Sequence, residues 1–390
     1  MASTPRRVAS RPMALATALA SAAVLVGQLS AVSQSPSAPV GSGPVGSIAA
    51  PVSPAPVDVA AITWKQSKAS KGFGPRDGAL LVADMAVGAD GRFLLVGVDS
   101  DLSPDRKAVV FGSDDGVRWK RLKGPLPKGS AAAGVVATPD GFLIVGDVDT
   151  SSSLLLTSDG TKVALLDAPA DGLPTGRLFG IALGPGGYVA AGTDTAGAAT
   201  MWTSPDGRTW AGAPLPEAAY VIHVAVADDG TLVALGNQQD ADGNRTPTVW
   251  SSVDGVAWTM HPLPVDPGNW SLADLERTPV GVLATLVNQG AGSVWLSSDG
   301  VTWTHVLDTS SRPMAGTAGT EAILLGTDAW WHSADGVTWQ EAAASFDGLS
   351  PETSAVRADG AVIAAAYQFT PTSMEGTGWS RTWVGRVPAP

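Results

Sequence analysis

The chain has 390 residues, a length that allows one large domain or two ordinary ones with ample apolar core. Glycine (46 residues) and tryptophan (14 residues) are abundant, which favours an all-β protein of short strands and tight turns. Cysteine is absent, which excludes disulfides, a thiolate nucleophile and Cys-ligated zinc. The formal net charge of −12 makes nucleic acid and anionic lipid poor partners.

The N-terminal residues have the pattern of an export signal. Three arginines precede a short apolar run, "MALATALASAAVLVG" (13–27), and small residues follow it. We therefore expect a signal peptide over residues 1–33 and a secreted protein, extracellular or associated with a cell wall. The alternative is an N-terminal membrane anchor, although the apolar run is short for a span. No membrane insertion is expected once the signal is removed.

Residues 34–57 are rich in Pro, Ser and Gly and poor in bulky side chains. Such a composition is typical of a linker that cannot pack a core. The folded domain is therefore expected over residues 58–390.

Within that domain a phrase of the form Ser-x-Asp-Gly-x-x-Trp recurs, for example "VWLSSDGVTWTHV" from Val294 and "VWSSVDGVAWTMH" from Val249. A large apolar residue stands four positions before each Asp, and a tryptophan stands four positions after it, except in the second copy, where Val163 replaces the tryptophan. The copies lie 36 to 48 residues apart, the scale of one propeller blade or solenoid unit. The six aspartates of the phrase are Asp115, Asp159, Asp206, Asp254, Asp299 and Asp335.

The residue types of the phrase predict a hairpin. Gly supplies the positive φ that a tight turn requires. The Asp carboxylate can accept hydrogen bonds from the backbone of its own turn, and the Ser hydroxyl can do so more weakly. The tryptophan can bury a large apolar face against the neighbouring unit. We therefore expect the six aspartates to be structural.

A second pattern alternates with the first: a tight turn followed by an apolar run, as in "ADGRFLLVGVD" (89–99), occurs seven times. One unit is therefore four strands, here called a to d from the centre outward. The last unit lacks strand d, and the segment around Trp64 near the N-terminus matches it, whereas Trp383 matches strand c. These patterns predict a seven-bladed β-propeller of four-stranded blades, closed by an N-terminal strand that completes the last blade.

The hairpin resembles the Asp-box, or bacterial neuraminidase repeat, in a form one residue shorter than the usual one. The resemblance covers the chain from about residue 58 to its end. Proteins that share the repeat include sialidases, xyloglucan-cleaving glycosidases, sorting receptors and assembly factors. The resemblance implies that the Asp-box turns lie on the face away from a catalytic pocket.

Function is expected on the opposite face and in the central channel, because variable loops on a rigid frame most often carry it. Strand a lines the channel, where most predicted positions are small, but Asp84, His223, Asp274 and Glu276 are not. Asp84, Asp274 and Glu276 are the candidate catalytic residues, because carboxylates can serve as acid and base. The alternative is that they are solvated or salt-bridged channel residues.

Five residues are candidate ligand contacts: His223, Arg277, Trp270, Trp379 and Tyr220. The two tryptophans are those that the repeat does not explain, and both fall on the variable face. An aromatic side chain there can stack on a sugar or a peptide, although packing within a loop is the alternative.

No metal or cofactor is expected, with one possible exception. Acidic and amide residues end each strand b, and oxygen ligands of this kind suit Ca²⁺. The alternative is that they are ordinary turn residues. They are Asp99, Asp147, Asp149, Asp194, Asn237, Asn288 and Asp328.

Sialidase activity is disfavoured, because the Arg-Ile-Pro motif of that family is missing from the start of the domain and no three-arginine clamp can be assembled from the predicted channel positions. We favour a non-catalytic extracellular binding or scaffolding module whose variable-loop face binds a glycan or a protein. The alternative is a glycoside hydrolase that uses the channel carboxylates.

Overall fold

The computed structural model describes residues 59–67, 79–100, 106–149, 152–166, 174–240, 245–265, 270–344, 346–357, 362–368 and 380–386. All of them belong to one compact unit, and apart from the short 3₁₀ turn η1 (Val59–Ala61) their regular structure is entirely β. Across these ranges, no helix has the length and apolarity needed to cross a membrane. The expected signal peptide and the linker lie outside the described residues.

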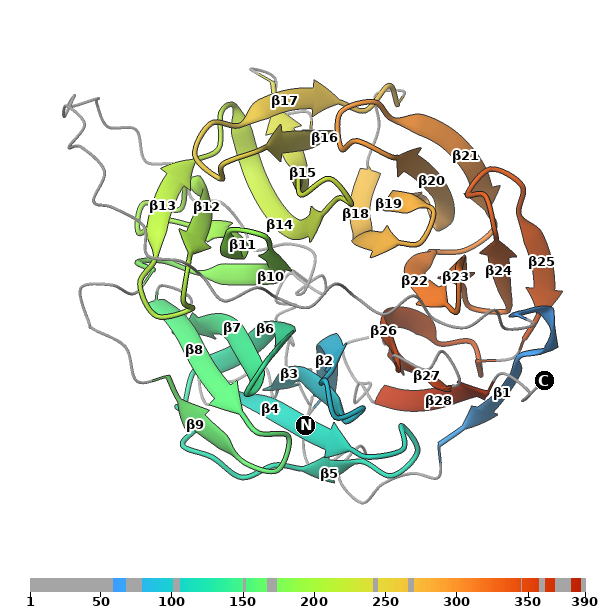
Figure 1. Cartoon of the computed structure of the whole chain (residues 1–390), viewed down its shortest axis with the longest axis horizontal. Coiled ribbons are helices and arrows are strands. Elements are labelled where there is room, and N and C mark those ends of the chain that lie inside the picture. The colour runs from blue at the N-terminus through green and yellow to red at the C-terminus, as the bar shows by residue number, and fades with distance from the viewer. Residues whose placement is uncertain are drawn as a thin grey trace, which may run out of the picture. The chain divides into compact units, whose positions relative to one another are not determined.

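Six sheets are blades of four consecutive strands, each ordered from the channel outward (Figure 1). The first three blades are β2 (Ala79–Val87), β3 (Phe93–Ser100), β4 (Lys107–Ser113) and β5 (Lys120–Arg121); β6 (Ser130–Thr138), β7 (Gly141–Val148), β8 (Ser152–Ser158) and β9 (Val163–Leu165); and β10 (Leu178–Gly184), β11 (Gly187–Thr193), β12 (Ala199–Ser204) and β13 (Ala211–Pro214). The next three are β14 (Ala218–Val226), β15 (Leu232–Gln239), β16 (Arg245–Ser252) and β17 (Thr259–Pro262); β18 (Trp270–Thr278), β19 (Gly281–Asn288), β20 (Ala291–Ser297) and β21 (Thr304–Thr309); and β22 (Met314–Ala318), β23 (Glu321–Leu325), β24 (Ala329–Ser333) and β25 (Gln340–Ala343).

One further four-stranded sheet is composite. It joins β26 (Ser350–Val356), β27 (Val362–Gln368) and β28 (Ser380–Arg386) to β1 (Thr63–Gln66), in the order β26-β27-β28-β1. The pairing of β1 with β28 places Trp64 opposite Gly385 and Gln66 opposite Trp383. The sequence-based prediction of seven blades is therefore corrected to six four-stranded blades of continuous chain, because the remaining sheet is assembled from the two ends of the domain.

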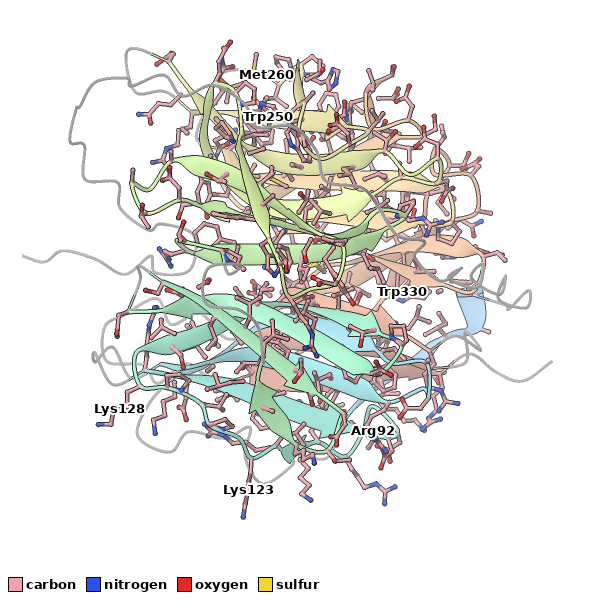
Figure 2. The ribbon with its side chains drawn as sticks, turned by 60° about the vertical axis from the view of Figure 1, so that its left-hand side comes forward. Arg92, Lys123, Lys128, Trp250, Met260 and Trp330 are labelled. Atoms are coloured by element: carbon pink, nitrogen blue, oxygen red, sulfur yellow. The ribbon has the colours of Figure 1, made fainter. Side chains whose placement is uncertain are left out.

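The innermost strands contact one another in a closed series: β2, β6, β10, β14, β18, β22, β26 and again β2. The core is not one central mass but a set of apolar clusters, each shared by two neighbouring sheets. Trp258 of the fourth blade, for example, packs with Val189 and Ala191 of the third blade. Trp250 is fully buried in the same cluster (Figure 2). Large apolar side chains thus hold each blade to its neighbour.

The Asp-Gly hairpins lie between the two outer strands of each continuous blade. In all six, one Asp oxygen accepts the backbone N–H groups two and three residues further along, at 2.7–2.9 Å. The following glycine has a φ between 69° and 79° in every copy, the left-handed region that favours glycine. In five copies the tryptophan indole N–H donates to that glycine's carbonyl oxygen. The loop is thereby closed on itself.

The second hairpin differs from the other five. Val163 stands at the tryptophan position and cannot donate to Gly160, and Ser158 pairs directly with Val163 across the two strands. The Ser158 hydroxyl donates to the carbonyl oxygen of Lys162 at 2.8 Å, and the Thr161 hydroxyl donates to Asp159. These short polar contacts replace the indole.

The two ends of the blades differ in what they carry. We call the end with the a–b turns and the Asp-Gly hairpins the turn face, and the end with the b–c and d–a connections the loop face. The longer connections are on the loop face; one of them, between β5 and β6, carries the exposed Lys123 and Lys128 (Figure 2).

Candidate functional site

The innermost strands share a β-bulge at the predicted channel position. The register of strands a and b shifts immediately before that position in six of the seven innermost strands, and β22 is the exception. A bulge re-aims a side chain and leaves ladder hydrogen bonds unmade, so local backbone groups need other partners. The residues that follow the six shifts are Asp84, Gly134, Gly180, His223, Asp274 and Thr353.

Asp84 supplies such a partner to two blades at once. Its Oδ1 atom accepts a hydrogen bond from the N–H of Met85 at 2.7 Å, and its Oδ2 atom accepts one from the N–H of Val135 on β6 at 2.8 Å. The hydroxyl of Thr353 on β26 donates to Oδ1 at 3.4 Å. The carboxylate therefore ties β2 to the innermost strand on either side of it.

Asp274 repeats the arrangement on β18. Its Oδ1 atom accepts the N–H of Leu275 at 2.9 Å, and its Oδ2 atom accepts the N–H of Ala315 on β22 at 3.1 Å. Both oxygens of both channel aspartates are thus occupied by backbone donors. An oxygen in this position is poorly placed to attack a substrate.

Burial raises the pKa of both aspartates. The pKa of Asp84 is about 6 and that of Asp274 about 7, because loss of solvation outweighs the backbone hydrogen bonds that favour the charged form. The charge of Asp84 adds to the rise at Asp274, whereas the nearby Arg312 opposes it.

Glu276 is the third candidate catalytic residue, two positions after Asp274 on β18. The surrounding protein, followed by the charges of Asp274 and Asp84, raises its pKa well above the ordinary value. Its side chain is nevertheless exposed to solvent, and its carboxylate accepts no hydrogen bond from the described part of the chain. Of the three carboxylates, Glu276 alone retains free oxygens for proton transfer.

Arg312 and Glu352 belong to the same region, and the sequence patterns did not single them out. Arg312 donates to the carbonyl oxygen of Pro351 and, at 3.3 Å, to that of Ala273, and it forms an ion pair with Glu352 at 3.0 Å. The guanidinium thus connects the segments on both sides of β22. Arg312 lies two residues before Met314, the predicted channel position of its strand. Counting back from the a–b turn therefore does not select it.

His223 is half-buried near this arginine. Burial, followed by the positive charge of Arg312, lowers the pKa of His223 to about 3. The imidazole is therefore neutral near pH 7, able to donate one hydrogen bond and accept another but not to supply a positive charge.

A second polar cluster occupies the loop face of the first three blades. Asp147, buried at the end of β7, pairs with Arg106 at 2.6 Å and with Arg177 at 3.2 Å. The guanidinium of Arg177 lies 4.9 Å from the ring centre of Phe179, which in turn contacts Tyr220 of the fourth blade. The pKa of Tyr220 is raised, chiefly by burial. Asp147 thus acts as an ion-pair partner between blades.

The other candidate calcium ligands do not form a common site, because each has different surroundings. Asp99 pairs with Arg121 at 3.0 Å, Asp194 accepts backbone N–H groups within its own turn, and Asn237 is buried. Within the described ranges no group of three or more His, Cys, Asp or Glu side chains has an arrangement that could hold a metal ion.

The remaining ligand candidates are dispersed. Arg277 pairs with the exposed Asp228 of the neighbouring a–b turn at 2.7 Å, on the turn face. Trp270 begins β18 on the loop face, where it is half-buried and packs against the apolar cluster shared by the fourth and fifth blades. Trp379 lies outside the described residues. Only Tyr220, Trp270 and His223 therefore remain on the loop-face side of the channel.

Comparison with known proteins shows the fold. Virginiamycin B lyase from Staphylococcus aureus is similar in structure, with a TM-score of 0.56, 13% identity and coverage of 84% of this chain and 100% of that one. The WD40 domain of Neurospora crassa Pan2 gives a TM-score of 0.53, 11% identity and coverage of 84% and 96%. A Trypanosoma rangeli sialidase is more distant, with a TM-score of 0.43, 12% identity and coverage of 79% and 55%. No protein-family model and no curated protein sequence matches the chain significantly. The likenesses establish a β-propeller and nothing finer.

Proposed function

We propose that the chain is a secreted, non-catalytic β-propeller that acts as an extracellular binding or scaffolding module, with a glycan or a protein bound on its loop face. The observation that supports this function is the use of both carboxylate oxygens of Asp84 and Asp274 as acceptors for backbone N–H groups of adjacent blades. Carboxylates committed in this way stabilise a frame and leave no pair of free acids for hydrolysis.

The loop face offers the chemistry of a recognition surface. Arg177, Phe179 and Tyr220 form a continuous half-buried group at the ends of innermost strands, and Trp270 begins the next one. Aromatic and arginine side chains on a rigid frame can contact a ligand at a low entropic cost. The export-signal pattern of residues 1–33 supports an extracellular location.

A second candidate function, glycoside hydrolysis, is favoured by Glu276. This carboxyl is solvent-exposed, free of hydrogen bonds from the described residues and raised in pKa, as a general acid requires. Inverting and retaining glycosidases both need a second carboxyl group with free oxygens. The channel carboxylates described above do not supply one.

Screening the chain on a glycan array and against chromogenic glycosides distinguishes the two functions. Retention of a glycan without cleavage, weakened by Tyr220→Ala at an unchanged melting temperature, is the expected result. Turnover that Glu276→Gln abolishes without unfolding the protein would overturn the binding function and support the hydrolase.

A further inference from the structure

A cavity of about 400 Å³ lies on the turn face, away from the channel and the loop face. The second blade supplies its a–b turn and its atypical hairpin, and the third blade supplies Tyr188 and its Asp-Gly turn. A volume of this size is within the range of pockets that hold small ligands.

The Asp-Gly turn of the third blade faces the second blade across this cavity. A Cβ atom placed on Gly255 would lie 2.4 Å from Thr203 of the third blade, and one on Gly300 would lie 2.6 Å from Val233 of the fourth. At Gly336 the distance to Leu296 of the fifth blade would be 2.8 Å. At Gly207 in the third blade the closest atom, on Leu143, is 3.1 Å away. The Gly207 turn therefore has slightly more room beside it than these three turns.

Tyr188 presents a hydroxyl group to this space. It begins strand b of its blade, at the position of the buried Phe93 and Phe142 in the first two blades, but it is only half-buried. Its ring lies 6.4 Å from that of Trp210, and its hydroxyl has no hydrogen-bond partner among the residues that the structure describes. Burial, followed by the charges of Asp140 and Asp206, raises its pKa, so both carboxylates are near.

The charged groups of the cavity are of both signs. Asp206 uses Oδ1 for its own turn and leaves Oδ2 without a partner among the described atoms. Lys162 and Arg208 are exposed and form no ion pair with a described carboxylate. The cavity therefore offers hydrogen-bond donors and acceptors beside the apolar surfaces of Tyr188 and Leu143.

We propose that this cavity between the second and third blades is a binding site for a neutral saccharide unit of one or two rings. A sugar ring packs its C–H face on an aromatic side chain, and its hydroxyls both donate to carboxylates and accept from cations. An anion would meet Asp140, Asp159 and Asp206, and a cation would meet Lys162 and Arg208. This site is independent of the loop-face ligand proposed above.

Saturation-transfer NMR on the full chain, with a panel of neutral mono- and disaccharides at millimolar concentration, tests the proposal. At least one saccharide is expected to bind. Ala164→Trp, which fills the cavity from an exposed position, should weaken that binding at least about tenfold. Tyr188→Phe should weaken it by about fivefold through loss of one hydrogen bond.

Thr259→Trp is the matched control. Thr259 stands five residues after Asp254, as Ala164 stands five residues after Asp159, and it is exposed but belongs to the fourth blade. It should leave binding and melting temperature unchanged. No binding by the whole panel, or binding that Ala164→Trp leaves intact, would overturn the proposal. Binding lost only in Tyr220→Ala would place the saccharide on the loop face and overturn this site while supporting the proposed function.

Discussion

The aspartates of the hairpins and those of the channel use the same side chain in opposite environments. Asp254 and Asp335 lie at exposed turns, and the backbone N–H groups of their own turns lower their pKa, to about 2 for Asp335. Asp84 and Asp274 accept N–H groups in the same manner, but burial raises their pKa to about 6 and about 7. Burial, and not the number of hydrogen bonds, decides the direction of the shift.

The difference also concerns what each carboxylate connects. A hairpin aspartate accepts hydrogen bonds from the backbone two and three residues after itself. A channel aspartate accepts them from strands of two different blades. The first kind shapes one turn, and the second holds the ring together. Four changes test this distinction.

The largest effect is expected from the tryptophan that anchors a hairpin. Trp258→Ala removes a buried side chain that packs across two blades and should lower the free energy of unfolding by about 3–5 kcal/mol. Urea unfolding monitored by circular dichroism measures the loss. Val163→Ala, at the matching position of the second hairpin, is the control and should cost clearly less. Equal losses would show that the indole adds nothing specific to the blade interface.

The second-largest loss of stability is expected from replacing a channel aspartate. Asp274→Ala leaves the N–H groups of Leu275 and Ala315 without their acceptor and should cost about 2–6 kcal/mol, because each buried donor without a partner costs about 1–3 kcal/mol. The same unfolding experiment gives the value. A loss no larger than that of Asp254→Ala would mean that water replaces the carboxylate, and the distinction between the two kinds of aspartate would then fail.

The stability should fall as the pH rises from 6.5 to 8. The folded-state pKa of Asp274, about 7, is above its ordinary value of 3.8, so the folded state holds a proton that the unfolded state has already lost. Raising the pH through 7 removes this contribution. His223, with a pKa of about 3, opposes the trend only below its ordinary value of 6.5, where the unfolded state takes up a proton.

Asp274→Asn provides the comparison for this pH dependence. Its free energy of unfolding between pH 6.5 and 8 should change less than that of the wild type, because the amide does not titrate. Hairpin aspartates, whose pKa is lowered, contribute stability above pH 4 that is lost only as the pH falls towards 2. Parallel curves for variant and wild type would contradict the raised pKa of Asp274.

The smallest effect is expected at a hairpin aspartate. Asp254→Ala removes two local hydrogen bonds at an exposed turn and should cost about 0.5–1 kcal/mol. Thermal unfolding suffices to measure it, and any ligand binding by the folded variant should be unchanged. Selective loss of binding at an unchanged melting temperature would show that the turn takes part in ligand binding and is not purely structural.

Much of the fold can be predicted from the sequence because its units are local. The Ser-x-Asp-Gly-x-x-Trp phrase marks five hairpins directly, since each of its residues bonds within the same turn. The segment around Trp64 also pairs with β28 at the strand position that the repeat assigns to it. The candidate site is less predictable. Counting back from the turns finds Asp84 and Asp274, but one of the two backbone donors at each comes from the next blade.

Arg312 and Glu352 escape the count for a related reason. Arg312 lies two residues and Glu352 one residue before the channel position counted from the turn of its unit, so the count does not select them. The free N–H groups left by a bulge are a tertiary feature with no residue pattern of its own. The cavity beside Tyr188 is likewise a tertiary feature, because residues of two blades line it, although Val163 marks the second hairpin as atypical.

The composite sheet determines when the molecule can finish folding. Thr63 pairs with Arg386, so a strand at one end of the folded domain waits for a partner at the other end before both are covered. Loop closure over so many residues carries an entropic cost, and the inter-blade contacts must offset it before the ring can shut. The pairing of β1 with β28 is thus the contact that closes the ring: without it the six continuous blades can form, but the edges of β1 and β28 stay open.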